Sequence, residues 1–74
     1  MTAVDRATEQ EHLRKAEADI AEANDRIARQ RALLAHLESD GHDTVMAKDL
    51  LQTMCQTLAA MEQHRQLILR ELGR

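Results

Sequence analysis

The sequence contains no phenylalanine, tryptophan, tyrosine or proline, and its only glycines are Gly41 and Gly73. Packed β-sheets depend on aromatic and β-branched side chains, and valine and isoleucine together supply only five residues here. Alanine, leucine, glutamate, glutamine, arginine and methionine dominate instead, and all of them favour helices. The composition therefore predicts an all-α fold.

Several functional classes lack their usual sequence signals. The formal net charge is −3, from ten basic and thirteen acidic residues, which gives no electrostatic footprint for nucleic acid or an anionic membrane. No stretch approaches the ~18 apolar residues of a membrane span, and the N-terminus has no apolar core of a signal peptide. One cysteine, Cys55, excludes an internal disulfide and suits a reducing compartment. We expect a cytoplasmic protein.

The only strong break in the helical pattern lies at residues 39–43. Gly41 suits the left-handed residue that follows a helix, and Asp43 or Thr44 can cap the next helix. We predict one domain over residues 1–74, with helices at about 4–38 and 44–72. Because Thr8 opens a capping-box pattern, the first helix could begin at Thr2 or Thr8.

Apolar residues recur at spacings of three and four along both predicted helices, as in a coiled coil. A five-residue connection makes the helices antiparallel neighbours, so the two stripes face each other in a hairpin. Folding at residue 40 or 41 sets Ile20 against Met61 and Ala16 against Arg65, whose charge can reach water. We call these positions the seam: Leu13, Ala16, Ile20, Ala23, Ile27, Gln30, Leu34, Leu37, Ala47, Leu51, Met54, Leu58, Met61, Arg65, Ile68 and Leu72.

One edge of this hairpin is expected to oppose like charges, Arg31 with Lys48 and Glu17 with Glu62. An antiparallel second copy would set basic against acidic residues at both ends. We therefore predict a homodimer that forms a four-helix bundle. The proposed interface, which we call the Cys55 flank, comprises Glu17, Asn24, Arg31, Lys48, Cys55 and Glu62.

The hydrophobic residues include many alanines, so a solitary hairpin has little apolar surface to bury and is expected to need a partner. Methionines and leucines make the second helix apolar over more than one stripe. This stripe is either bundle core or an adaptable groove for a helix of another protein.

Candidate chemical groups are few. The segment Asp40-Gly41-His42-Asp43 offers two carboxylates and an imidazole to a metal, but helix capping already accounts for Gly41 and Asp43. The histidines His12, His36 and His64 stand singly on charged edges. No Ser–His–acid set, phosphate-binding glycine loop or cysteine pair is present, so we expect no enzyme activity, no cofactor and no metal.

Cys55 has two interpretations. A lone cysteine at a helix–helix edge is most often a small buried hydrophobe. A reversible disulfide between two copies is the alternative.

Residues 40–44, Asp-Gly-His-Asp-Thr, precede Leu50-Leu51, Leu58, His64-Arg65 and Ile68-Leu69. This pattern, over about half of the chain, resembles a group of short uncharacterised bacterial helical-hairpin proteins. The resemblance implies a hairpin fold and a bacterial source, without an activity. The architecture is also similar to plasmid RNA-binding hairpin dimers that regulate copy number, which is an analogy of fold alone.

The sequence favours a small interaction, scaffold or regulatory protein that acts through helix–helix contacts as a homodimer. An RNA-binding regulator of the helical-hairpin type is the alternative, although the charge makes nucleic acid a poor partner. A metal or redox switch at His42 or Cys55 is the least favoured class.

Overall fold

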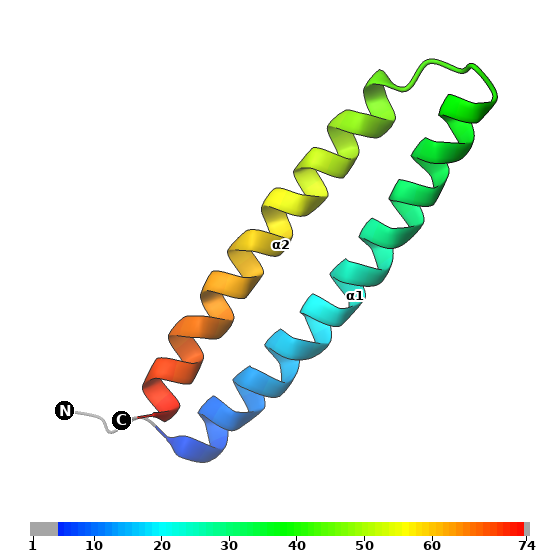
Figure 1. Cartoon of the computed structure of the whole chain (residues 1–74). Helices are drawn as coiled ribbons and strands as arrows, with labels where there is room; N and C mark the ends of the chain where they lie inside the picture. The colour runs from blue at the N-terminus through cyan, green and yellow to red at the C-terminus, as the bar shows by residue number, and fades with distance from the viewer. Residues whose placement is uncertain (1–4, 74) are drawn as a thin grey trace.

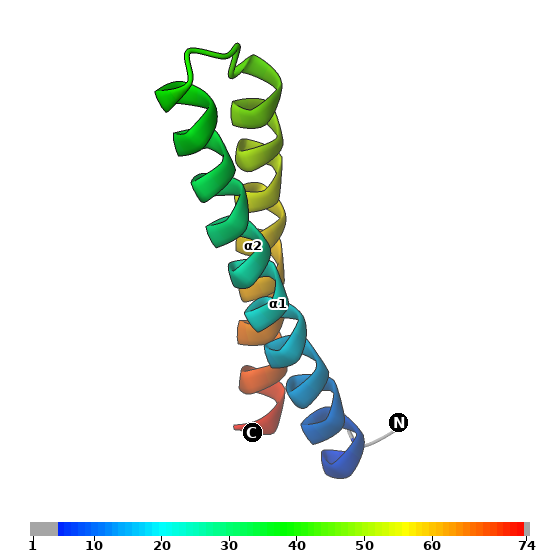
Figure 2. The ribbon, with the colours of Figure 1, turned by 90° about the vertical axis from the view of Figure 1, so that its right-hand side faces the viewer.

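The computed structural model describes residues 5–73, which form two helices, α1 (Arg6–Ser39) and α2 (Val45–Leu72). The helices lie side by side as an antiparallel hairpin that measures 59 × 16 × 14 Å, with the turn at one end (Figure 1). At the other end the Arg6 guanidinium donates to the Leu72 carbonyl across 3.0 Å. Turned by 90°, α1 crosses in front of α2 at a slight inclination (Figure 2). The prediction of an all-helical hairpin is confirmed.

Helix α1 begins after Asp5, whose carboxylate caps it. One oxygen accepts a hydrogen bond from the Ala7 backbone N–H (3.1 Å), and the other accepts one from the Thr8 hydroxyl (2.8 Å). The prediction that Thr8 caps the helix is therefore wrong, because Thr8 lies inside the first turn and donates to the true cap. The other predicted start, Thr2, lies outside the described residues.

The turn follows from the backbone freedom of Gly41. Its N–H donates to the Glu38 carbonyl (3.2 Å), and the N–H of His42 donates to the Leu37 carbonyl (2.9 Å). These two bonds define a Schellman motif, in which the first residue after the helix cap must adopt a left-handed conformation. Gly41 supplies it with φ +74°, as the sequence predicted.

Helix α2 starts at Val45, one residue later than expected. Thr44 occupies the cap position without a side-chain hydrogen bond to the helix, and the carboxylate of Asp43 accepts the Val45 N–H instead (3.0 Å). Of the two predicted caps, Asp43 therefore satisfies a free backbone donor.

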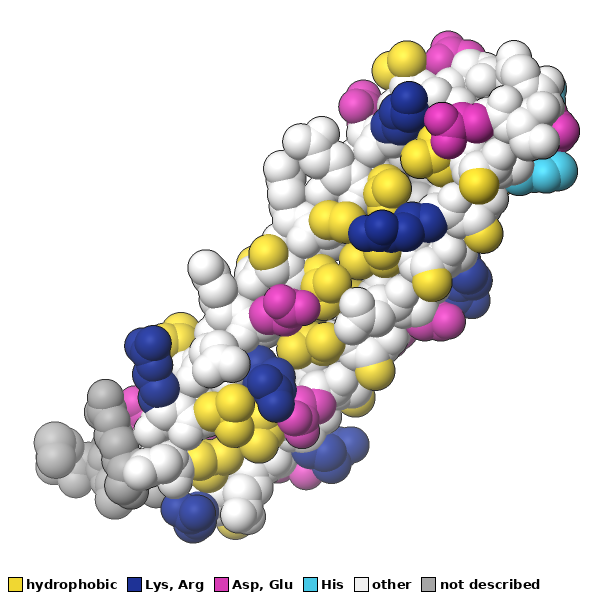
Figure 3. Space-filling model, in the orientation of Figure 1, with side chains coloured by type: hydrophobic (Ala, Val, Ile, Leu, Met, Phe, Trp, Pro, Cys, Tyr) yellow, Lys and Arg dark blue, Asp and Glu magenta, His cyan; other side chains and the backbone are white. Residues whose placement is uncertain are grey.

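All of the predicted seam residues are buried or half-buried, but few are buried deeply. Among residues 5–73, only Ala16, Ile27 and Ile68 have a relative solvent exposure of 9% or less. No side chain in that range is less than 2% exposed. On the face shown in Figure 3, hydrophobic side chains form a band between the helices, with charged side chains of both signs lying beside and across it. The seam thus remains open to its flanks.

Two hydrogen bonds between the helices define the register. The Gln30 amide donates to the Ala47 carbonyl, and the Arg65 guanidinium donates to the Glu17 carboxylate, each across 3.1 Å. Asn24 lies about midway between the α1 partners, and Thr57 lies about midway between the α2 partners. Residues 24 and 57 are therefore nearly level along the hairpin.

The left-handed Gly41 predicts a backbone cost that should be separable from any packing cost. A Cβ at Gly41 would meet no atom within 4 Å, whereas its φ of +74° disfavours an L-residue. Gly41→Ala should lower the free energy of unfolding by about 1 kcal/mol. Gly73→Ala is the control, because Gly73 has φ −80° and its Cβ would make an ordinary contact of 3.4 Å. Urea unfolding at fixed protein concentration measures both, and equal effects would contradict this explanation of the turn.

The seam carries the stability of the hairpin, and Ile27 is among its best covered side chains at 6% exposure. Ile27→Ala should cost about 2–3 kcal/mol, because the methyl groups it removes are surrounded on the seam. Val45→Ala removes methyl groups that are 61% exposed and should change stability by less than about 0.5 kcal/mol. Thermal unfolding followed by circular dichroism compares the two variants; a larger loss for Val45→Ala would show that the seam is misplaced.

Candidate interaction surface

Four of the five large apolar side chains that stay exposed in the described residues lie on one flank of the hairpin. Leu33 is 47% exposed, Leu50 51%, Leu67 57% and Met46 86%. On α2, Met46, Leu50 and Leu67 belong to a second stripe at spacings of three and four, which runs beside the seam. A further exposed residue, Val45, lies at the start of α2, away from this stripe.

We call this side the Thr57 flank. Each of its positions, on either helix, directly precedes a seam residue. This places all of them on the same side of an antiparallel pair. Helix α1 contributes Asp19, Glu22, Arg26, Arg29 and Leu33. Helix α2 contributes Met46, Leu50, Thr53, Thr57, Ala60, His64 and Leu67.

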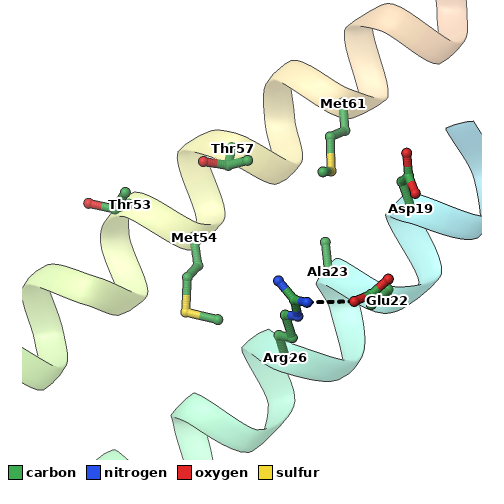
Figure 4. Close-up of a pocket in the computed structure, with 8 residues that line it drawn as sticks. All are labelled: Asp19, Glu22, Ala23, Arg26, Thr53, Met54, Thr57 and Met61. Carbon is green, nitrogen blue, oxygen red and sulfur yellow. Dashed lines mark hydrogen bonds and ion pairs between the residues drawn. The ribbon is translucent and has the colours of Figure 1, made fainter.

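A shallow groove of about 340 Å³ lies at the middle of the Thr57 flank. Met54 and Met61 extend from α2 toward α1, on either side of Ala23, and form its apolar floor (Figure 4). Its remaining lining residues are Asp19, Glu22, Arg26, Thr53 and Thr57. The seam is therefore accessible from this side over about two helical turns.

The charged groups along this groove pair within α1. Arg26 donates to the Glu22 carboxylate at 2.6 Å, and the Lys15 ammonium lies 3.4 Å from the Asp19 carboxylate. Each of these side chains is substantially exposed, so the pairs contribute little to stability. Their charges remain available to a molecule that docks on the flank.

The predicted Cys55 flank has different contacts. The Glu17 carboxylate binds Arg65, 3.1 Å away, and the Arg31 guanidinium lies 3.8 Å from the Cys55 sulfur. The side chains of Glu17 and Arg31 thus already have partners within the hairpin. Cys55 is a free, half-buried thiol. The role of this flank as a dimer interface stays a prediction.

The histidines and acidic residues show no concentrated site. His12 lies 2.9 Å from the Glu9 carboxylate, and His36 lies 3.1 Å from that of Asp40. Among residues 5–73, no group of three or more histidine, cysteine or acidic side chains is arranged to hold a metal ion. No helix in the described part of the chain is long and apolar enough to cross a membrane.

The resolved pKa shifts arise from surface hydrogen bonds. The Arg14 hydrogen bond lowers the pKa of the Glu11 carboxyl, and the same contact raises the pKa of Arg14. The Thr8 hydroxyl, and next the Ala7 N–H, lower the pKa of the Asp5 carboxyl. Catalytic groups owe their shifts to burial or to a charged cleft, and these groups lie in neither.

Comparisons of the chain with protein-family models, with curated proteins and with solved structures find no match. The resemblance to bacterial helical-hairpin proteins therefore rests on the turn and seam residues alone.

The lowered pKa of Asp5 makes part of the hairpin's stability depend on pH. A carboxyl whose pKa falls on folding stabilises the fold above its unfolded value, ordinarily 3.8, and this contribution disappears as the pH drops through the folded value. Asn can still cap a helix but does not titrate. The difference in melting temperature between the natural chain and Asp5→Asn should therefore be constant near neutral pH and shrink below about pH 4. A difference that persists unchanged to about pH 2 would show that the Asp5 charge plays no part.

Proposed function

We propose that the chain is a non-enzymatic interaction protein that acts through helix–helix contacts and pairs with a second copy as a four-helix bundle. The observation that carries the proposal is the exposure of Leu33, Met46, Leu50 and Leu67 on one flank of a hairpin whose described residues include only three buried hydrophobic ones. Exposed apolar patches mark interaction surfaces, and Met46 and Leu50 lie one turn apart near the start of α2, with Leu67 on the same flank near its end. A partner that covers this face completes the core.

A second hairpin fits this requirement. Four-helix bundles surround each core side chain with neighbours from several helices, which two helices cannot do. The two described helices also leave most seam side chains only half-buried, so the hairpin buries little apolar surface by itself. Self-association supplies the missing area without a second protein.

The outer face of α1 would remain free in such a bundle, and its charges are balanced. Arg14 pairs with Glu11, and His36 faces Asp40. A nucleic-acid surface needs basic groups that are not already matched by carboxylates. This pattern favours a protein partner, in the manner of a scaffold or adaptor, over the RNA-binding alternative.

Sedimentation equilibrium over a concentration series tests the proposal. We expect a species of twice the 8.4 kDa chain mass that dissociates on dilution with loss of helical signal. A fully folded monomer at all concentrations would contradict the homodimer. Binding to single- or double-stranded RNA that appears at low salt and weakens steeply as salt rises would instead support the RNA-binding alternative.

A further inference from the structure

We propose that the second copy docks on the Thr57 flank, antiparallel to the first, with the two-fold axis passing beside Thr57. The inference rests on the proposed homodimer and specifies its interface. In this arrangement α2 of one copy packs on α2 of the other, and α1 packs on α1. Every neighbouring pair of helices in the bundle is then antiparallel.

The positions of the exposed stripe on α2 are spaced symmetrically about Thr57, so that Leu50 falls opposite His64 of the second copy. Leu50 and His64 lie seven residues on either side of Thr57, while Met46 and Leu67 lie eleven and ten residues away. Reversing the second α2 therefore brings Met46, which is 86% exposed, against Leu67 of the second copy. The residues near the axis, Thr53, Thr57 and Ala60, are small enough for the two helices to approach closely.

The charges on α1 indicate the same axis independently. Glu22 and Arg26 lie two residues on either side of residue 24, and Asp19 and Arg29 lie five residues on either side. An antiparallel copy centred there sets Arg26 against Glu22 of the second copy, and Arg29 against its Asp19. Because residue 24 is nearly level with Thr57, one two-fold axis satisfies both helices.

The flank also has the size that a stable dimer needs. A face 59 Å long and 14–16 Å wide covers roughly 800–950 Å² per copy, close to the ~800 Å² per partner of a standard interface. The central groove would face its counterpart across the axis. Met54 and Met61 of both copies would then become the middle layer of the bundle core.

The Cys55 flank is the competing interface, and its charges are symmetric too. Glu17 and Arg31 lie seven residues on either side of residue 24. Both side chains contact α2 of their own hairpin. Of the exposed large apolar residues that the structure describes, only Val45, three residues before Lys48, lies toward that side, and the other four lie on the Thr57 flank. We therefore place the interface on the Thr57 flank, because most of the exposed large apolar side chains lie there.

A charge exchange between two variant chains tests the interface directly. In Arg26→Glu and in Glu22→Arg, positions 22 and 26 carry the same charge, so each homodimer would oppose like charges. We expect each variant alone to dimerise about tenfold more weakly than the natural chain at low salt. An equimolar mixture should regain the natural affinity as a heterodimer, since two acidic side chains on one copy then face two basic side chains on the other.

Each substitution also disturbs the ion pair within its own helix, but that effect is the same whether a variant is alone or mixed. Recovery of affinity on mixing therefore reports contact between the two copies. Arg31→Glu, on the Cys55 flank, is the matched control and should leave the dimer constant unchanged. If Arg31→Glu weakens dimerisation, and the mixture of Arg26→Glu with Glu22→Arg shows no recovery of affinity, the interface lies on the Cys55 flank. That result would overturn the inference. A natural chain that stays monomeric would overturn the proposed function itself.

Cross-linking gives a second measurement. With Cys55→Ser to remove the native thiol, Thr57→Cys places one thiol per chain beside the axis. Copper–phenanthroline with oxygen takes up two electrons and two protons as each pair of thiols forms a disulfide. We expect Thr57→Cys to form a covalent dimer at least about ten times faster than the natural Cys55 chain and than Gln63→Cys, an outer-face control for random collision. Equal rates for all three, or faster linking through Cys55, would overturn the assignment.

Discussion

A pair of helices touches along a single line, and the rest of this structure depends on that constraint. Each seam side chain is covered by one opposite helix and by its own helix, so it stays open on both flanks. Ala16, Ile27 and Ile68 reach low exposure, while the long Met54 and Met61 form the floor of a groove. Burial beyond this level requires further helices.

The features that the sequence predicted well are those set by local chemistry. Gly41 is the one residue near the middle of the chain that adopts a left-handed conformation without strain, so the turn could not be elsewhere. The seam followed from spacing because residues three and four apart share one face of a helix, and the large apolar residues of α1 recur at these spacings along one stripe. The start of α1 was harder, since Thr8 matches a capping pattern. Asp5 prevails because its two oxygens accept the Ala7 N–H and the Thr8 hydroxyl together.

The flanks could not be resolved from sequence in the same way. Spacing predicts that Glu17 lies near Glu62 and Arg31 near Lys48, but side chains of this length choose among several neighbours. Glu17 binds Arg65, a seam residue whose charge was expected to reach water. Exposure of Leu33 and Leu50 also depends on how far apart the helices hold them, which a one-dimensional pattern does not contain.

The order of charges along α1 affects both the stability of the single helix and the direction in which two copies pack. Glu22 precedes Arg26 by four residues, and Asp25 precedes Arg29 in the same way; both pairs close within the helix at 2.6 and 2.9 Å. This order, acid before base, also suits the helix dipole. When a helix with this order meets a reversed copy of itself, acid and base change places and come opposite each other. A parallel copy in register would bring acid against acid. The pattern that stabilises the isolated helix therefore also selects the antiparallel direction of its partner.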